Sequence, residues 1–154
     1  MKISEKAKQI AFVLLVLAAS LIAVYAIFFF EPQQKEVSME EFLQKAHAAD
    51  KIALFLDARG TDDETARKIY QCATDLASGR FLGTKTVETY GCDDSQCIYM
   101  GSQGTKHLTY EQLKQSLRGM LYIRVSAGAP STKAFENRLE IKLDSNYTVG
   151  CKIG

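Results

Sequence analysis

The stretch Lys51-Ile52-Ala53-Leu54-Phe55-Leu56 contains an unbroken apolar run of strand length. A strand that is buried on both faces of a sheet has this pattern, whereas a half-exposed strand alternates apolar and polar residues. A loop over residues 57–60 follows, and Thr61-Asp62-Asp63-Glu64 then forms a capping box, a common start of a helix that Gly79 can end. The expected core-facing residues of this helix are Ala66, Ile69, Tyr70, Ala73 and Leu76. The stretch and its continuation therefore predict a central strand, a loop and an amphipathic helix.

Capping boxes and turn residues predict the elements on either side of this unit. Ser38 begins a capping box before a short helix, and Thr109 begins another before a helix that Gly119 can end. The expected core-facing residues are Met39, Phe42, Leu43 and Ala46 in the first helix and Tyr110, Leu113 and Leu117 in the second. Apolar patterns predict strands over 85–91, 98–100 and 120–125, loops over 102–105 and 128–133, an alternating strand with Phe135, Leu139, Ile141 and Leu143, a turn at 144–146, and a last strand with Tyr147, Val149, Cys151 and Ile153. This order predicts the α+β class, with helices layered on a mostly antiparallel sheet.

Residues 10–30 form a run of 21 residues without a charge. At the helical rise of about 1.5 Å per residue, the run spans the roughly 30 Å of a bilayer's hydrocarbon core. Lys2, Lys6 and Lys8 precede it, which favours a cytoplasmic N-terminus under the positive-inside rule. We therefore expect a single-pass protein of the cell membrane with an extracytoplasmic C-terminal domain. The expected division is a cytoplasmic leader (1–9), a transmembrane signal anchor in contact with the lipid bilayer (10–30), a juxtamembrane linker and helix (31–50) and the α+β domain (51–154).

Two other interpretations of the apolar run are open. Val24-Tyr25-Ala26 matches the small-residue pattern of signal-peptide cleavage, in which case the chain is secreted after cleavage. An N-terminal apolar helix that leads into a small sheet domain with a C-terminal disulfide is also similar in outline to the pilin subunits. The glycine that usually precedes pilin processing and the acidic residue shortly after it have no counterpart here.

The chain has four cysteines, and all of them follow the apolar run. An even number of cysteines outside the membrane favours disulfides, because extracytoplasmic compartments are oxidising. Cys92 and Cys97 flank the tip of the predicted hairpin, where opposed Cα atoms lie about 4.5–5.5 Å apart, so we expect them to pair with each other. Cys72 and Cys151 then form a second disulfide between helix and sheet, in one of three possible pairing schemes. A four-thiolate zinc site and a redox-active pair at Cys92 and Cys97 are the alternatives.

Charge and composition exclude some classes of function. Lysines and arginines number 19 and aspartates and glutamates 18, and after residue 31 the two signs are equal in number. A neutral domain lacks the basic surface by which proteins bind nucleic acid, so no nucleic-acid partner is expected. Charged residues make up 24% of the chain and apolar residues 47%, as in an ordinary globular domain. Asn146-Tyr147-Thr148 matches the N-glycosylation pattern at an expected turn, which makes Asn146 a candidate glycosylation site.

The best candidate for ligand binding is the loop from Asp57 to Asp63, with Asp57, Arg59 and Thr61 as its candidate residues. The loop lies between the carboxyl end of a buried strand and a helix, where α/β folds bind ligands, and the helix start could hold an anion together with Arg59. Asp57-Ala58-Arg59-Gly60-Thr61 resembles the first motif of the haloacid dehalogenase family, in which an Asp nucleophile is followed two residues later by an acidic Asp and then by Thr. Arg59 stands where that family has its acid. A plain strand-to-helix turn, with Gly60 relieving strain and Thr61 capping the helix, also explains these residues.

The sequence contains no motif that predicts catalytic residues, a metal site or a cofactor. We therefore expect a structural or protein-interaction role, as a small subunit of an envelope assembly that contacts a protein partner or assembles with itself. The alternatives are a small-ligand receptor or an enzyme that uses the Asp57–Asp63 loop, and a pilin-like subunit.

Overall fold

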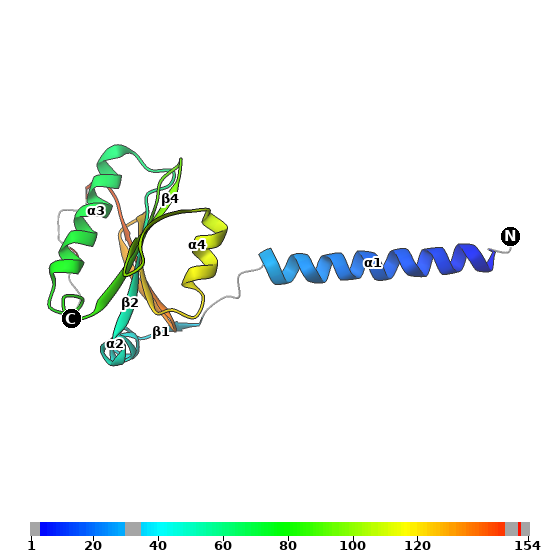
Figure 1. Cartoon of the computed structure of the whole chain (residues 1–154), viewed down its shortest axis with the longest axis horizontal. Coiled ribbons are helices and arrows are strands. Elements are labelled where there is room, and N and C mark those ends of the chain that lie inside the picture. The colour runs from blue at the N-terminus through cyan, green and yellow to red at the C-terminus, as the bar shows by residue number, and fades with distance from the viewer. Residues whose placement is uncertain (1–3, 30–34, 147–150, 152–154) are drawn as a thin grey trace. The chain divides into compact units, whose positions relative to one another are not determined.

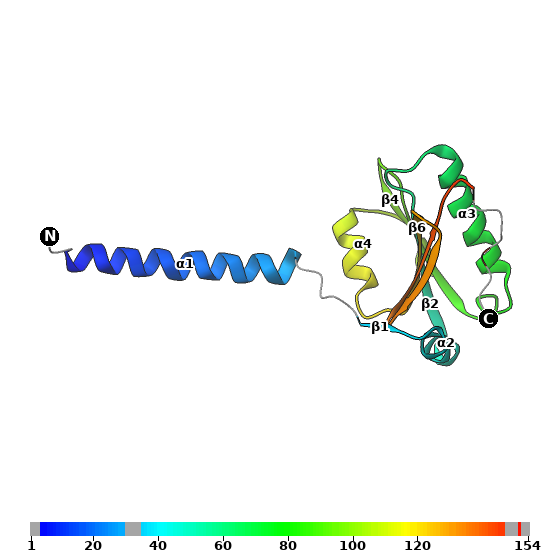
Figure 2. The ribbon, with the colours of Figure 1, turned by 180° about the vertical axis from the view of Figure 1, so that it is seen from behind.

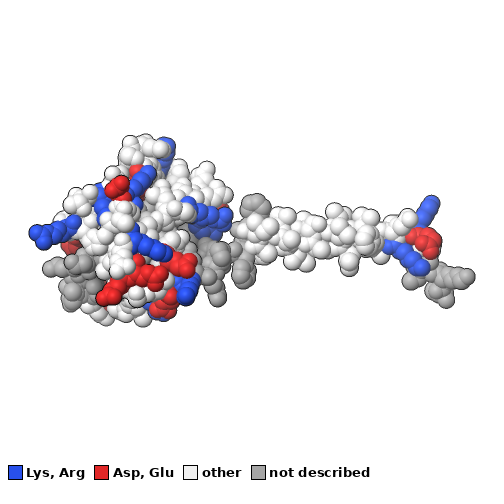
Figure 3. Space-filling model, turned by 90° about the horizontal axis from the view of Figure 1, so that it is seen from below, with Lys and Arg blue, Asp and Glu red and all other residues white. Residues whose placement is uncertain are grey.

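The computed structural model describes residues 4–29, 35–146 and 151, which belong to two units, Met1–Gln34 and Lys35–Gly154. The first unit contains one helix, α1 (Glu5–Phe29), so the predicted apolar helix is present and begins within the charged leader (Figure 1). Over Glu5–Ile27 it is long and apolar enough to cross a membrane, by a criterion that a signal sequence also meets. Beyond the charged residues at its N-terminal end, the helix has no Lys, Arg, Asp or Glu residue (Figure 3).

The second unit is built on one sheet of eight strands in the order β1-β7-β8-β6-β2-β3-β4-β5. The strands are β1 (Glu36–Val37), β2 (Lys51–Asp57), β3 (Thr86–Cys92), β4 (Cys97–Gly101), β5 (Gly104–Leu108), β6 (Tyr122–Ala127), β7 (Ser131–Phe135) and β8 (Arg138–Leu143). The helices of this unit are α2 (Met39–Ala48), α3 (Asp63–Ser78) and α4 (Tyr110–Leu117). Helices α3 and α4 cover opposite faces of the sheet (Figures 1 and 2). The predicted α+β class and the position of the central strand are thus confirmed.

The sheet is mixed, with its parallel part in the middle. The four inner strands β8, β6, β2 and β3 are parallel, whereas β7 and β1 at one edge and β4 and β5 at the other pair antiparallel. The prediction of a mostly antiparallel sheet is therefore wrong for the central strands, which are parallel. The reason is that β2 reaches β3 through α3, and a strand that follows a helical crossover runs parallel to the strand before it.

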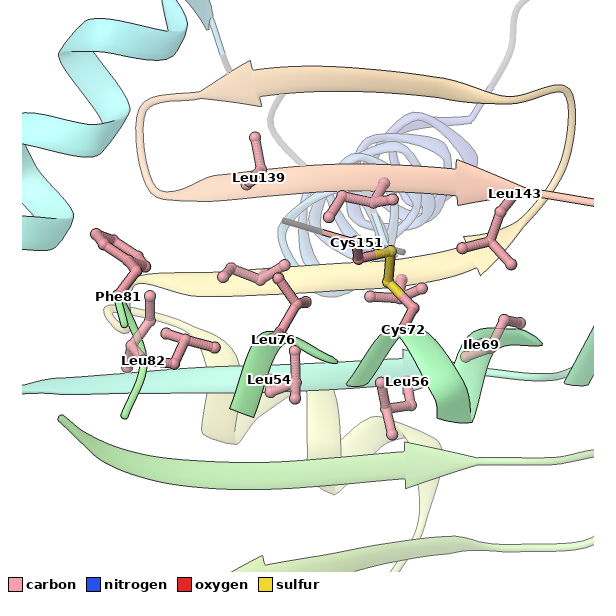
Figure 4. Close-up of a cluster of buried hydrophobic side chains, with 14 of the residues drawn as sticks. Leu54, Leu56, Ile69, Cys72, Leu76, Phe81, Leu82, Leu139, Leu143 and Cys151 are labelled. Atoms are coloured by element: carbon pink, nitrogen blue, oxygen red, sulfur yellow. A yellow bond between two sulfur atoms is a disulfide. The ribbon is translucent and has the colours of Figure 1, made fainter. Parts of the chain in front are cut away.

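The larger core cluster lies between α2, α3 and one face of the sheet. Leu54 and Leu56 of β2 face Ile69, Cys72 and Leu76 of α3 (Figure 4). Burying a leucine or isoleucine side chain contributes about 1.5–3 kcal/mol, so this layer carries much of the stability. The predicted helix face is partly wrong, because Tyr70 is 47% exposed. The buried face of α3 instead follows Thr65, Ile69, Cys72 and Leu76.

The start of α3 also differs from the prediction. Asp62, rather than Thr61, is the N-cap, and its carboxylate accepts a hydrogen bond from the Thr65 amide at 2.7 Å. The Thr61 hydroxyl donates to the Ala58 and Asp62 carbonyls instead. Both residue types are good N-caps, so the choice depends on where the chain leaves β2.

A smaller core cluster lies on the opposite face, under α4. Leu113 and Leu117 of α4 pack there with Ala53 and Phe55 of β2 and with the tyrosines of β3 and β4. The capping box predicted at Thr109 is complete: the Thr109 hydroxyl accepts from the Gln112 amide and the Gln112 side chain accepts from the Thr109 amide. Gly119 follows the helix with a φ of 76°, a conformation that favours glycine.

Two predicted loops contain strands. Residues 102–105 turn between β4 and β5, and residues 128–133 include the start of β7. Strand β5 was missed because four of its five residues are exposed, so it has no apolar alternation. Phe135 and Leu139, expected in one strand, belong to β7 and β8, which form a hairpin. The predicted last strand lies outside the described residues except for Cys151.

Both predicted disulfides are present, with the predicted pairing. Cys72 of α3 is bonded to Cys151, and Cys92 is bonded to Cys97, its cross-strand partner at the end of the β3–β4 hairpin. All four residues are buried. The four residues between Cys92 and Cys97, which form the tip of the hairpin, are exposed. Because all four cysteines are in disulfides, none is a thiolate that could bind zinc.

Candidate functional site

The carboxyl ends of the neighbouring strands β2 and β6 lie at the point in the sheet where the chain continues to opposite sides of β2. From β2 the chain passes through α3, on one face of the sheet, to β3 on one side. It later passes through α4, on the other face, to β6 on the opposite side of β2 (Figure 2). In open α/β sheets, the crevice at such a switch point is the common place for a ligand. The topology thus singles out this edge of the sheet.

An open pocket of about 370 Å³ lies at this edge. It is lined by side chains from the ends of three parallel strands and the loop after β2, namely Asp57, Arg59, Arg124, Ser126, Ala127, Glu140 and Lys142. Asp57, Ser126 and Lys142 are register partners across β2, β6 and β8, and Arg124 and Glu140 form the next row. Strand register therefore gathers on one face residues that are far apart in the sequence.

Asp57 is the most buried group of the pocket and is enclosed by two guanidinium groups. Arg59 donates from its Nε and Nη2 atoms to the two carboxylate oxygens, both at 2.8 Å, and Arg124 donates from Nη2 at 2.7 Å. Burial alone would raise the pKa of Asp57, but the hydrogen bonds and charges of Arg59 and Arg124 outweigh it and lower the pKa to about 2. Such a carboxylate stays ionised and its oxygens are occupied, which suits a fixed structural charge better than a nucleophile or a general base.

Arg59 is fixed from three sides. Its guanidinium lies over the Tyr110 ring, 3.7 Å from the centroid, in addition to its contacts with Asp57. The loop that carries it is bound to the disulfide hairpin, since the Gly60 amide donates to Asp94 at 2.7 Å and the Ala58 amide donates to the Cys92 carbonyl at 2.8 Å. Gly60 itself has a φ of 67°. The arginine therefore lines the pocket and is also paired with a local carboxylate.

The third predicted ligand residue, Thr61, is not among the residues that line the pocket. Its hydroxyl is used within the turn, and the first turn of α3 carries Asp63 and Glu64 behind the Asp62 cap. Carboxylates at a helix N-terminus satisfy the amide groups and the dipole that would otherwise attract an anion. The start of α3 is thus already occupied by the chain's own acidic groups.

The sequence pattern does not single out four residues of the pocket, Arg124, Ser126, Glu140 and Lys142. They alternate with buried apolar residues along β6 and β8, and that alternation was the available signal for one polar sheet face. Their proximity to Asp57 depends on the parallel pairing of the strands, which the sequence pattern does not specify.

A second buried carboxylate, Glu88, is held by contacts that stabilise the fold. It accepts hydrogen bonds from the Tyr99 hydroxyl, from the Ser102 hydroxyl at 2.5 Å and from the Ser102 amide at 3.3 Å, and Lys51 lies 3.2 Å away. The hydrogen bonds from Ser102 and Tyr99, with the charge of Lys51, outweigh burial and lower the pKa of Glu88 to about 2. These contacts fix the β4–β5 turn against β3.

The candidate glycosylation residue Asn146 is exposed, and its backbone amide donates a hydrogen bond to the Asp144 carboxylate at 3.0 Å. The other two residues of its motif lie outside the described residues. Among the described residues, no group of three or more His, Cys, Asp or Glu side chains could hold a metal ion.

Comparison with protein-family models, curated proteins and solved structures gave no match to this chain.

Proposed function

We propose that the chain is a single-pass membrane protein whose helix α1 anchors an extracytoplasmic domain with a structural or protein-interaction role, as a small subunit of an envelope assembly. The observation that carries this proposal is the combination of α1, an apolar helix of membrane-spanning length, with a domain that contains two disulfides. Disulfides persist in oxidising compartments, so they agree with the orientation that Lys6 and Lys8 favour.

A binding role is supported over a catalytic one by the state of the buried acids. Asp57 is held by two arginines and Glu88 by a tyrosine, a serine and a lysine, and the pKa of each is lowered to about 2. A general acid or base near neutral pH needs a pKa close to the working pH. Neither carboxylate meets that requirement.

A small-ligand receptor is the second candidate function. It is favoured by one observation, the open pocket at the switch point between β2 and β6, beside Arg59. A receptor domain on a membrane anchor is compatible with the first proposal, since a subunit of an assembly can also bind a ligand.

Membrane anchoring is tested with the full chain carrying a C-terminal tag. We expect it to remain in the membrane pellet after an alkaline wash and to keep residues 1–26 by mass spectrometry, whereas a Leu14→Arg, Leu17→Arg variant leaves the pellet because charge in the hydrocarbon core is costly. Leu14→Ala, Leu17→Ala is the matched control and should stay. A mature chain that begins at Ile27 would replace the anchor with a cleaved signal peptide.

Orientation and interaction need two further measurements. Protease added to spheroplasts should remove the C-terminal tag; a protected tag would reverse the topology. Purification in mild detergent should yield either a stoichiometric protein partner or a self-assembled form. Recovery of an isolated monomer, without either, would refute the interaction role.

The receptor function is tested by thermal shift of the full chain against a panel of anionic, neutral and cationic small molecules. We expect shifts that are lost in Ser126→Trp, because the larger side chain fills the pocket. Lys106→Trp on the exposed strand β5 is the control. Shifts that survive in Ser126→Trp, or no shift from any class, would refute the receptor function.

A further inference from the structure

We propose that the pocket at the carboxyl ends of β2, β6 and β8 binds a small oxyanion, that is, a molecule carrying a carboxylate or a phosphate. This inference rests on the receptor function and names its class of ligand. The donors for the oxyanion are the ammonium group of Lys142 and the hydroxyl group of Ser126, in the field of Arg59 and Arg124.

The charge balance of the pocket favours an anion. Its lining contains three cations, Arg59, Arg124 and Lys142, and two carboxylates, Asp57 and Glu140. Both carboxylates are already paired with arginine: Asp57 with Arg59 and Arg124, and Glu140 with Arg124 at 3.3 Å. One positive charge is therefore left over, and an anion in the pocket would balance it.

The surplus charge belongs to a specific group. Among the described residues, no carboxylate lies within 4.0 Å of the Lys142 ammonium, although the other two cations of the pocket are in ion pairs. Lys142 is exposed on the face of β8 that lines the pocket, two residues from Glu140 on the same strand face. Ser126, its register partner on β6, contributes a hydroxyl that can donate a second hydrogen bond.

The arginines are preorganised for this role. Arg124 is held between Asp57 and Glu140, and Arg59 between Asp57 and the Tyr110 ring. An anion that enters the pocket meets charges that are already in place, so little side-chain entropy is lost on binding. Asp57 acts as a positioning residue, because its contacts orient both guanidinium groups and leave its own oxygens occupied.

The place and size of the pocket agree with a small ligand. The crevice lies at the switch point of the sheet, where ligands of open α/β folds commonly bind. On this face α4 packs over β2, β3 and β4, and the pocket opens beside it over β6 and β8. About 370 Å³ is at the lower end of the range for small-molecule sites, enough for a phosphate or a short carboxylic acid with its water.

The test titrates the full chain, in neutral detergent, with inorganic phosphate and with acetate, using isothermal titration calorimetry at constant ionic strength set by chloride. We expect saturable binding of at least one of the two anions. Lys142→Gln should weaken it at least tenfold, and Ser126→Ala should weaken it severalfold, because each removes a donor at the anion.

The control is Lys133→Gln. Lys133 of β7 is the register partner of Glu140 and carries the same charge on the same sheet face, but it does not line the pocket. It should change the affinity less than twofold. Equal weakening by Lys133→Gln and Lys142→Gln would show general attraction by surface charge and refute the site.

The outcomes distinguish a phosphate-bearing ligand from a carboxylate, and failure of the oxyanion proposal from failure of the receptor function. Binding of phosphate alone assigns a phosphate-bearing ligand, and binding of acetate alone assigns a carboxylate. Absence of saturable binding of either anion refutes the oxyanion proposal. In that case a neutral or cationic molecule whose thermal shift is lost in Ser126→Trp would leave the receptor function standing.

Discussion

Gly101 of β4 lies directly over the buried carboxylate of Glu88, and replacing it with alanine should destabilise the domain. A Cβ atom at this position would collide with the Glu88 carboxylate and with the Tyr99 hydroxyl. Its φ is not in the left-handed region, so the backbone would accept alanine and only the lack of space opposes it. The neighbouring strand offers a matched control, since a Cβ atom at Gly91 of β3 meets nothing within 4 Å.

The magnitudes follow from these two environments. Overpacking at a well-filled position costs about 1–3 kcal/mol, whereas replacing glycine with alanine where the backbone permits it stabilises by about 0.4–1 kcal/mol through the unfolded chain. Gly91→Ala should therefore be neutral or slightly stabilising. Gly101→Ala should be less stable than Gly91→Ala by about 2 kcal/mol, because it also disturbs the hydrogen bonds that Glu88 accepts.

Urea unfolding in mild detergent, followed by the near-UV circular dichroism of the tyrosines, measures both variants. Tyr90 and Tyr99 are buried with ring centroids 5.1 Å apart, so their signal reports the packing around β3 and β4. In a Glu88→Ala background the cost of Gly101→Ala should fall, which a double-mutant cycle detects. Equal stability of Gly91→Ala and Gly101→Ala, or an unchanged cost in the Glu88→Ala background, would refute the packing argument.

Three further predictions concern the disulfides, acid stability and the two-unit division. Replacing the Cys72–Cys151 pair by alanines should lower the free energy of unfolding by about 2 kcal/mol more than replacing the Cys92–Cys97 pair. The sequence separations are 79 and 5 residues, and loop-closure entropy grows with the logarithm of loop length. All four residues are buried, so equal losses in urea unfolding would mean that loop closure does not decide the difference. Asp57 and Glu88 should contribute fully to the free energy of unfolding above about pH 5 and lose this contribution as the pH falls toward about 2, because folding lowers the pKa of each to about 2. The contribution of Asp57 is on the order of 2 kcal/mol. A urea midpoint that does not change over this pH range would contradict the prediction. A chain that begins at residue 32 should be soluble and give the same near-UV spectrum, because residues 35–154 form one compact unit; aggregation under oxidising conditions would show that α1 contributes to the core.

The features that the sequence predicted correctly depend on neighbouring residues. The strand around Leu54, the capping box at Thr109 and the pairing of Cys92 with Cys97 all follow from patterns a few residues long. The Cys72–Cys151 disulfide is predicted from the two cysteines that remain and from the alternation that places Cys151 on the covered face of the sheet. The N-cap of α3 was misplaced by one residue, because Thr61 and Asp62 are both good caps and the choice depends on tertiary contacts.

The features that the sequence missed depend on contacts between distant segments. Asp57, Ser126 and Lys142 share a row because β2, β6 and β8 are parallel and in register. A shift of one residue in any of these strands would turn its side chain to the other face of the sheet. The pattern of charges in each strand was visible, but it carries no information about which strand lies beside which. The sequence therefore predicts Asp57 and Arg59 as ligand residues but not the side chains of β6 and β8 that complete the pocket.

The disulfide hairpin and the pocket are parts of one structure. The Cys92–Cys97 bond closes the end of the β3–β4 hairpin, and the loop beyond it holds the Arg59 loop through the hydrogen bond from Gly60 to Asp94. Arg59 is paired with Asp57, which also orients Arg124 of β6. Opening the disulfide would remove one constraint on the loop that carries Asp94, so we expect reduction of the hairpin to loosen the Arg59 loop. An oxidising compartment would therefore serve the pocket as well as the stability of the domain, which links the proposed location of the domain to its proposed ligand.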